Sequence, residues 1–311
     1  MNSTLSSQAP VARGLVKPLP PMSSALKMRR TVKDYGMRGL CALTTLIAVI
    51  PLFLVLYYVT VQGLKVMNLE FFTQIQKPAG EVGGGLKQSI VGTLMMVGLA
   101  SCIGLPIGIL GGIYLSEFGQ NRFGFIVRFA ADVLNGVPSI ITGVFVYAIA
   151  VLPVANATRD WDEPIRYSAW AGGLALGIMM IPTVMRTTEE IVRLVPQSLR
   201  EGALALGDTR WHSTLVIVLG AAKGGVITGV LLAIARVAGE TAPLIFTAGS
   251  SLYFNLNPSK QTDSLPYRIF ISATSADDRW QALAWGGAFV LVAMIFLLSL
   301  LARYVTRVKS V

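Results

Sequence analysis

Charged side chains are scarce in this chain. Asp, Glu, Lys and Arg make up 14% of its 311 residues, whereas roughly 25% is usual for a soluble domain. Apolar residues make up 53%. This balance argues against a soluble globular domain and favours a chain that buries much of its surface in lipid.

Cysteine and histidine are almost absent. Cys41 and Cys102 lie inside apolar runs, and they provide neither a disulfide framework nor the spacing of a metal site. The single histidine, His212, lies in a charged segment, where an interfacial polar role is expected. We therefore expect no metal site and no catalytic residues, and we predict that the chain is not an enzyme.

The beginning of the chain lacks the features of a secretory signal. Residues 1–39 are polar and basic, and the first apolar run, 40–62, is too long and starts too late for a signal peptide. The sequence predicts a basic, disordered cytoplasmic tail over 1–39, followed by a membrane domain over 40–311.

Long apolar runs, in contrast, are abundant. A run of about 18 residues is enough to predict a membrane-spanning helix, and backbone groups in lipid must be hydrogen-bonded internally. Because these runs do not alternate with polar residues, helices are favoured over barrel strands. We predict an all-α, polytopic helical bundle with six transmembrane helices at 40–62, 89–114, 130–153, 169–186, 226–249 and 282–304.

The positive charges are distributed unevenly between the predicted loops. With the N-terminus inside, cytoplasmic segments hold sixteen Lys and Arg residues and external segments hold eight. This asymmetry predicts that both termini are cytoplasmic. The net charge of +10 then faces lipid headgroups, so we expect no nucleic-acid partner.

Glycine recurs at intervals of four within two of the predicted spans. Gly104, Gly108 and Gly112 lie in one span, and Gly173 and Gly177 lie in another. Small residues at this spacing allow two membrane helices to approach closely. The pattern indicates a packed bundle but does not indicate a function.

One predicted span carries two opposite charges. Arg236 and Glu240 lie in 226–249, and Arg236 is expected near the bilayer centre, about 15 Å into the helix. An isolated charge there costs at least ~2.5–3.5 kcal/mol. The two residues are one helical turn apart, so they either neutralise each other or line a substrate pathway.

The neighbouring residues favour a pathway. Gly239 and Pro243 predict a helix break beside the charges, and discontinuous helices line the midplane sites of transporters. The fork of Arg236 suits an oxyanion. Glu240 adds an acceptor, to which a protonated phosphate can donate and a fully deprotonated sulfate cannot.

A glycine-rich stretch, 80–89, resembles a phosphate-binding loop only superficially. It reads GEVGGGLKQS, and it lacks the Gly-Lys-Ser/Thr ending and the preceding strand of a P-loop. We therefore predict that the chain contains no ATPase of its own.

The charged segment 187–222 contains a recognisable pattern. It resembles the EAA signature of importer permeases of the ABC transporter superfamily, although Gly202 replaces the first alanine and Gly220 replaces the final proline. The resemblance implies a coupling helix that docks on an ATPase subunit. The implied docking residues are Glu201, Gly202, Ala203 and Gly207.

Further stretches make the resemblance more specific. ARVAGETAPLIFTA, LNGVPSIITGVF and GIYLSEFG are similar to the phosphate-specific importer permeases, of the PstA type. The resemblance covers about residues 35–307 and implies the type I ABC importer permease fold. It also implies import of inorganic phosphate across a bacterial cytoplasmic membrane, driven by ATP hydrolysis in another subunit.

The same resemblance implies the other components. They are a paralogous second permease (PstC type), two ATPase subunits (PstB type) that bind ATP and Mg, and a periplasmic phosphate-binding protein (PstS type). No cofactor is expected in this chain. Arg186 resembles an arginine that the family places near the pathway, although at the end of a span it could instead reach the headgroups.

Several alternatives stay open at this stage. The substrate could be another oxyanion, such as sulfate or molybdate, or the chain could be a secondary transporter with an Arg236–Glu240 proton relay. The EAA-like segment argues against the latter, because a secondary transporter has no ATPase to contact. For Asp132 and Asn135 we expect helix capping, and for Lys223 an interfacial position.

Overall fold

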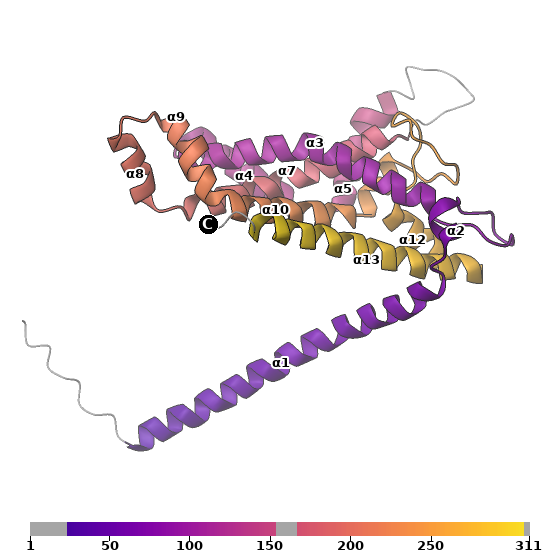
Figure 1. The fold of residues 1–311 in the computed structure, drawn as a ribbon, viewed down its shortest axis with the longest axis horizontal. Coiled ribbons are helices and arrows are strands. Elements are labelled where there is room, and N and C mark those ends of the chain that lie inside the picture. The colour runs from indigo at the N-terminus through magenta and orange to yellow at the C-terminus, as the bar shows by residue number, and fades with distance from the viewer. Residues whose placement is uncertain (1–23, 154–166, 308–311) are drawn as a thin grey trace, which may run out of the picture. The chain divides into compact units, whose positions relative to one another are not determined.

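The computed structural model describes residues 24–153 and 167–307, and every regular element in these ranges is helical (Figure 1). The all-α expectation is therefore confirmed for the described residues. The elements, in chain order, are α1 (Ser24–Lys65), α2 (Leu69–Thr73), α3 (Lys87–Glu117), α4 (Arg122–Gly136), α5 (Ser139–Val146), the π-helix η1 (Tyr147–Val151), α7 (Ala169–Arg193), α8 (Gln197–Ala205), α9 (Arg210–His212), the π-helix η2 (Ser213–Val218), α10 (Leu219–Ala238), α11 (Ala242–Thr247), α12 (Leu265–Ala273) and α13 (Asp278–Arg307).

The start of the first helix differs from the sequence prediction. Residues 24–39, expected as part of a disordered tail, form the first turns of α1. They include good helix formers such as Ala25, Leu26 and Met28, so the polar stretch can continue the helix beyond the apolar run. Residues 1–23 of the predicted tail lie outside the described residues.

The chain divides into two compact units. Residues up to Leu56 form one unit, and residues from Tyr57 onward form the other.

Five described helices are long and apolar enough to cross a membrane, and a bent pair of helices provides a sixth candidate. The bent pair corrects the predicted continuous span at 130–153. α4 ends at Gly136, and the axis then turns by 104° into the helix that begins at Ser139. The cause is Pro138, which lacks an N–H and keeps Val137 extended (φ −71°, ψ 129°).

The glycine pattern of the sequence forms the contact between α3 and α7. A Cβ added to Gly108 would lie 2.7 Å from the Cβ of Val184, and one added to Gly112 would lie 2.6 Å from the carbonyl oxygen of Met185. A Cβ on Gly173 would lie 2.6 Å from that of Leu99. The predicted close approach of two helices is therefore confirmed.

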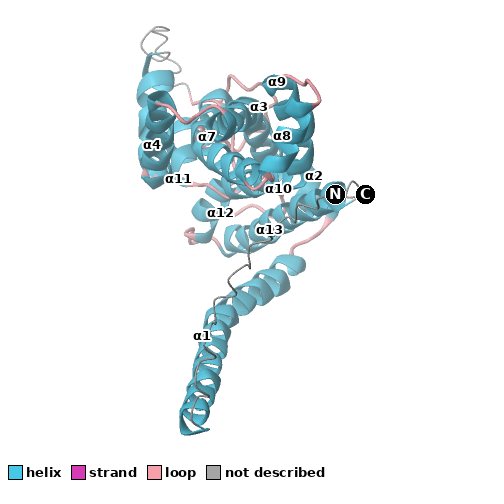
Figure 2. Cartoon of the chain, turned by 90° about the vertical axis from the view of Figure 1, so that its left-hand side faces the viewer, coloured by secondary structure: helices cyan, strands magenta, loops and turns pink. Residues whose placement is uncertain are grey.

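The bundle of residues 57–307 has two polar ends. Its core joins α3, α7, α10 and α11 through Met96, Met180, Val184, Ala233 and Leu244. α8 and α9 lie together at one end, and α2, α12 and the start of α13 lie at the other (Figure 1), and Figure 2 views the chain from the α8 end. Polar clusters lie at both ends and are described below.

Candidate functional site

The helix that carries Arg236 is interrupted just after it. α10 ends at Ala238, and the N–H groups of Gly239 and Glu240 donate to the carbonyl oxygens of Arg236 (3.1 Å) and Val237 (3.2 Å). The chain resumes a helix at Ala242, with Pro243 in its first turn. The expected break is therefore present, whereas the prediction of one span over 226–249 is wrong at its end.

Arg236 lies just before this break and Glu240 lies within it. The Nε of Arg236 lies 3.8 Å from Oε1 of Glu240, and the two side chains are 57% and 21% exposed. That distance is too long for a hydrogen bond, so the guanidinium fork stays open to an external acceptor. Arg236 occupies the last turn of α10, not the middle of a helix as predicted, and its charge there complements the helix dipole.

Arg186 is held by two carboxylates. Its Nε donates to Oδ1 of Asp132 (2.7 Å), a terminal nitrogen donates to the other Asp132 oxygen, and the remaining nitrogen donates to Oε2 of Glu189 (2.9 Å). Asp132 lies inside α4, whose N-cap is Asn121. The expected capping role of Asp132 is therefore wrong. Asn135 likewise caps no helix and accepts the hydroxyl hydrogen bond of Thr183 (3.2 Å).

Glu189 is the centre of this cluster, and sequence reasoning missed it. It is 1% exposed, and its Oε1 lies 2.6 Å from both Arg128 and Arg193. Arg128 also donates to the carbonyl oxygens of Leu115 (2.6 Å) and Gly119 (2.8 Å) at the end of α3. The spacing of Glu189 from Arg186 and Arg193 could have indicated the pairs within α7. The contact with Arg128 depends on the fold.

The EAA-like segment contains a short separate helix. Of the predicted range 187–222, residues 187–193 continue α7 and residues 219–222 begin α10. α8 lies between them and carries Glu201 and Gly202, which are exposed, and Ala203, which is buried. A Cβ on Gly202 would meet no atom within 4 Å, so this face of α8 is open.

Gly207 ends α8 in a left-handed conformation. Its φ is +86°. Its N–H donates to the carbonyl oxygen of Leu204 (3.0 Å), and the N–H of Asp208 donates to the carbonyl oxygen of Ala203 (3.2 Å). These two bonds form a Schellman motif, and a side chain at this φ strains the backbone. The glycine of the signature is therefore required by the shape of the turn.

Gly207→Ala is expected to destabilise the end of α8. A left-handed residue with a Cβ costs about 1–2 kcal/mol, so amide hydrogen exchange over 197–208 should become roughly tenfold faster. Gly207→Asn is the matched control and should exchange more slowly than the alanine variant, because asparagine tolerates this conformation. Exchange in the alanine variant equal to that of the unchanged chain would contradict the prediction.

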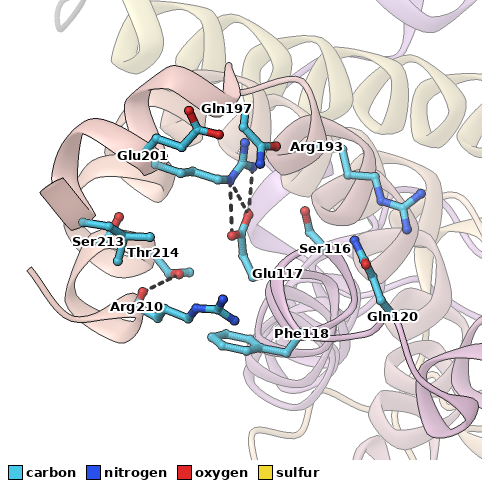
Figure 3. Close-up of a pocket in the computed structure, with 12 residues that line it drawn as sticks. Ser116, Glu117, Phe118, Gln120, Arg193, Gln197, Glu201, Arg210, Ser213 and Thr214 are labelled. Atoms are coloured by element: carbon cyan, nitrogen blue, oxygen red, sulfur yellow. Dashed lines mark hydrogen bonds and ion pairs between the residues drawn. The ribbon is translucent and has the colours of Figure 1, made fainter.

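A polar cavity of about 710 Å³ separates α8 from the end of α3. Figure 3 shows Glu117, Arg193 and Glu201 around it. Arg200 of α8 donates to Oε1 of Glu117 (2.8 Å) and to the carbonyl oxygen of Val192 (2.9 Å). Arg200, which the sequence did not single out, thus fixes α8 to both α3 and α7.

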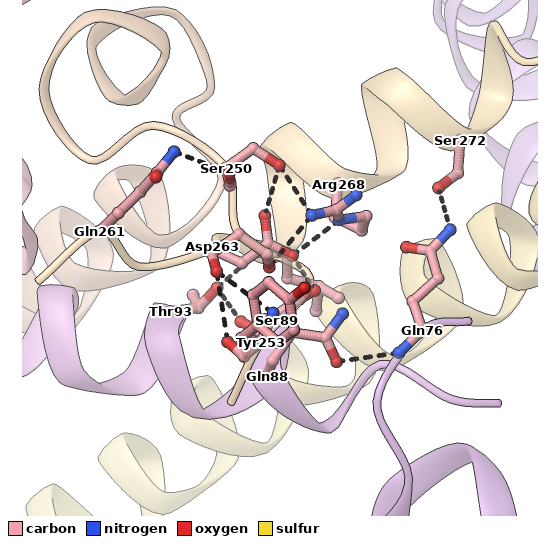
Figure 4. Close-up of polar contacts among 12 residues, drawn as sticks. Gln76, Gln88, Ser89, Thr93, Ser250, Tyr253, Gln261, Asp263, Arg268 and Ser272 are labelled. Atoms are coloured by element: carbon pink, nitrogen blue, oxygen red, sulfur yellow. Dashed lines mark hydrogen bonds and ion pairs between the residues drawn. The ribbon is translucent and has the colours of Figure 1, made fainter. Parts of the chain in front are cut away.

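The opposite end of the bundle holds a buried ion pair (Figure 4). Nε of Arg268 lies 2.7 Å from Oδ2 of Asp263, and the two side chains are 3% and 0% exposed. Asp263 also accepts hydrogen bonds from Ser89 of α3 and from Ser250 (3.2 Å). Burial raises the pKa of Asp263, and Arg268, Ser89 and Ser250 oppose that rise. The ion pair ties the 250–264 segment to α12, and the hydrogen bond from Ser89 ties it to α3.

Candidate metal ligands do not gather in the described part of the chain. Among residues 24–153 and 167–307, no group of three or more His, Cys, Asp or Glu side chains is placed to hold a metal ion. The arginines of these clusters carry donors that can form charge-assisted hydrogen bonds with carboxylates and other oxyanions.

Comparison with known proteins identifies the class. Residues 104–310 match the family model described as "Binding-protein-dependent transport system inner membrane component", and the chain belongs to this family. It is a multi-pass membrane protein. The chain is 39% identical over 268 residues to the phosphate transport system permease protein PstA of Yersinia pestis, covering 86% of this chain and 88% of that protein. It is also 39% identical to PstA of Haemophilus influenzae over 268 residues, covering 86% and 91%.

A solved structure supports the fold. The chain is similar to one in the "Crystal structure of a bacterial ABC transporter involved in the import of the acidic polysaccharide alginate", with a TM-score of 0.56 and 15% identity. The match covers 91% of this chain and 100% of that chain. The expected fold, that of an ABC importer permease, is therefore confirmed.

Proposed function

We propose that this chain is the PstA-type permease subunit of an ATP-driven importer, and that it moves inorganic phosphate across the bacterial inner membrane with both termini in the cytoplasm. The observation that carries the proposal is the interrupted helix at 239–241. It presents Arg236, with an open guanidinium fork, beside the carboxylate of Glu240. The 39% identity to two PstA proteins supports phosphate as the substrate.

The charges at the break fit the needs of a transported anion. Phosphate loses hydration on entering the membrane, and the planar fork of Arg236 replaces part of that hydration with charge-assisted hydrogen bonds. Glu240 limits how tightly the anion is held and accepts a hydrogen bond from a protonated phosphate. A pathway site must bind strongly enough to admit the anion and weakly enough to release it.

The other end of the bundle fits the coupling role. Glu201 and Gly202 on the open face of α8, with Ala203 and Gly207 shaping the helix, would contact the ATPase subunit. Arg200 would transmit movement of α8 to α3 and α7 through its bonds to Glu117 and Val192. ATP and Mg would be bound by two PstB-type subunits, since the chain has no ATP-binding motif and needs no cofactor of its own.

The remaining components of the importer follow from the proposed PstA-type function. A PstC-type permease would complete the pathway, and a PstS-type periplasmic protein would deliver phosphate. An importer of another oxyanion is the second candidate, because the fork of Arg236 also fits sulfate or molybdate. A secondary transporter is disfavoured by α8, which such a transporter does not need.

The test is ATP hydrolysis in proteoliposomes that contain this chain with its three candidate partner proteins. Phosphate presented with the binding protein should stimulate hydrolysis several-fold, and sulfate should leave it at the basal rate. Stimulation by sulfate or molybdate alone would transfer the proposal to that oxyanion. An assembled complex that no oxyanion stimulates would refute it.

A further inference from the structure

α1 is longer than the hydrocarbon core of a bilayer is thick. It contains 42 residues and is drawn as one long helix in Figure 1, which corresponds to about 63 Å at 1.5 Å per residue. The hydrocarbon core of a bilayer measures about 30 Å, and the apolar run 40–62 is long enough to cross it. The part of α1 that precedes residue 40 therefore extends beyond this core.

This extension of α1 is amphipathic. Met28, Val32 and Tyr35 follow the i, i+4, i+7 spacing that places residues on one face of a helix, and they are 72%, 66% and 69% exposed. The charged residues of the extension lie outside this apolar stripe, and they are Arg29, Arg30, Lys33, Asp34 and Arg38. Four of these five charges are positive, so the extension combines an apolar stripe with a cationic remainder.

The rest of the described chain does not cover the extension. Every residue from 28 to 38 is exposed. The guanidinium carbon of Arg38 lies 5.8 Å from the centre of the Tyr35 ring, so this cation flanks the apolar stripe. If the extension continued into water, three large apolar side chains would stay hydrated, which is unfavourable. A surface that is apolar inside and anionic outside would satisfy both the stripe and the cations.

The membrane that α1 crosses is such a surface. In an interfacial helix the apolar side chains enter the boundary between headgroups and acyl chains, and the cations contact anionic headgroups. Gly36 and Gly39 lie where the extension meets the apolar run, and a Cβ on either glycine would meet no atom within 4 Å. Glycine is a weak helix former at which helices bend. The extension can therefore turn onto the bilayer surface.

We propose that residues 28–38 form a membrane-surface helix that binds the headgroups of anionic phospholipids. Met28, Val32 and Tyr35 lie in the acyl boundary, and the cations of the other faces neutralise the lipid phosphates. This contact fixes the depth of α1, so that the apolar run 40–62 stays in register with the hydrocarbon core. The inference goes beyond phosphate transport and does not depend on it.

The test measures the depth of spin labels in the complex of this chain with its partner subunits, carrying Cys41→Ser and Cys102→Ser, in lipid nanodiscs. One label is attached at Val32→Cys, and the matched control on the opposite face is attached at Asp34→Cys. In bilayers of phosphatidylethanolamine and phosphatidylglycerol, the label at position 32 should be several-fold more accessible to oxygen than to a water-soluble nickel complex. The label at position 34 should show the reverse.

The charge of the lipid is tested on the same labels. In phosphatidylcholine nanodiscs, the label at position 32 should become as accessible to the nickel complex as the label at position 34. The combined substitution Arg29→Gln, Lys33→Gln and Arg38→Gln should have the same effect in the anionic bilayer. Arg29→Lys with Arg38→Lys keeps the charge and should leave the label in lipid. Burial of position 32 that survives in phosphatidylcholine would overturn the recognition of anionic headgroups.

A protein partner that covers the stripe is the competing explanation. A label covered by another subunit is shielded from oxygen and from the nickel complex alike, whereas a label in lipid is shielded only from the nickel complex. Shielding from both at position 32 would overturn the proposal, and so would equal nickel accessibility at positions 32 and 34 in the anionic bilayer. Phosphate-stimulated ATP hydrolysis by the same preparations reports separately on the proposed function.

Discussion

Replacing Arg236 with glutamine is expected to abolish phosphate uptake while the complex still assembles. The open fork of Arg236 offers two charge-assisted hydrogen bonds to an oxyanion, and each is worth roughly 1.5–3 kcal/mol. Loss of both would slow transport by about 100-fold or more. Assembly should survive, because Arg236 is 57% exposed and forms no close pair with Glu240.

Uptake of radiolabelled phosphate by whole cells or proteoliposomes measures this effect, with co-purification of the partner subunits as the test of assembly. Lys223→Gln is the matched control, since it removes one positive charge from the exposed surface of the same helix. Full uptake by the Arg236→Gln variant would exclude a role for Arg236 in the pathway. An equal loss in Lys223→Gln would point to the charge of the helix as a whole.

Replacing Arg268 with methionine is expected to produce the largest loss of stability. Methionine keeps an unbranched apolar stem like that of arginine but leaves the carboxylate of Asp263, which is 0% exposed, without its cation. Removing one member of a buried ion pair costs roughly 3–5 kcal/mol. Thermal unfolding of the purified complex in detergent measures it. Arg279→Met, on the exposed surface of α13, is the control and should unfold like the unchanged chain.

The pH dependence of this loss follows from the pKa of Asp263. Burial raises the pKa of Asp263 in the folded chain above its value in the unfolded chain. Between these two pKa values the folded chain binds the proton more tightly, so the free energy of unfolding falls as the pH rises through this range. Removal of Arg268 raises the pKa of Asp263 further. The deficit of Arg268→Met should therefore be greatest at neutral pH and should shrink at mildly acidic pH, where Asp263 is protonated. A deficit that grows on acidification would contradict this account.

The sequence predicts the helices of this protein well because apolar runs report directly on burial in lipid. It predicts some interruptions of these helices and misses others. Gly239 and Pro243 indicated the break after α10, but Pro138 was passed over and it bends the chain by 104°. Pro106 and Pro182 lie inside α3 and α7, which continue through them. A proline alone therefore does not distinguish a bend from a tolerated residue.

The polar clusters were only partly predictable for a different reason. Arg236 and Glu240 stand out because they interrupt an apolar run one turn apart. The contacts of Glu189 with Arg128, and of Arg186 with Asp132, join residues 61 and 54 positions apart. No local spacing encodes such pairs. They are set by the packing of α4 on α7.

The glycine-lined contact between α3 and α7 has a mechanical consequence. Backbones this close leave no room for side chains to slide past one another, so the low-cost shear seen between ordinary packed helices is blocked. We expect the two helices to move as one rigid body, which extends from the Asp263–Ser89 contact at one end of α3 to Glu117 at the other. A displacement of α8 would then tilt α3 and α7 together, and the bends at Pro138 and Gly239 would act as hinges.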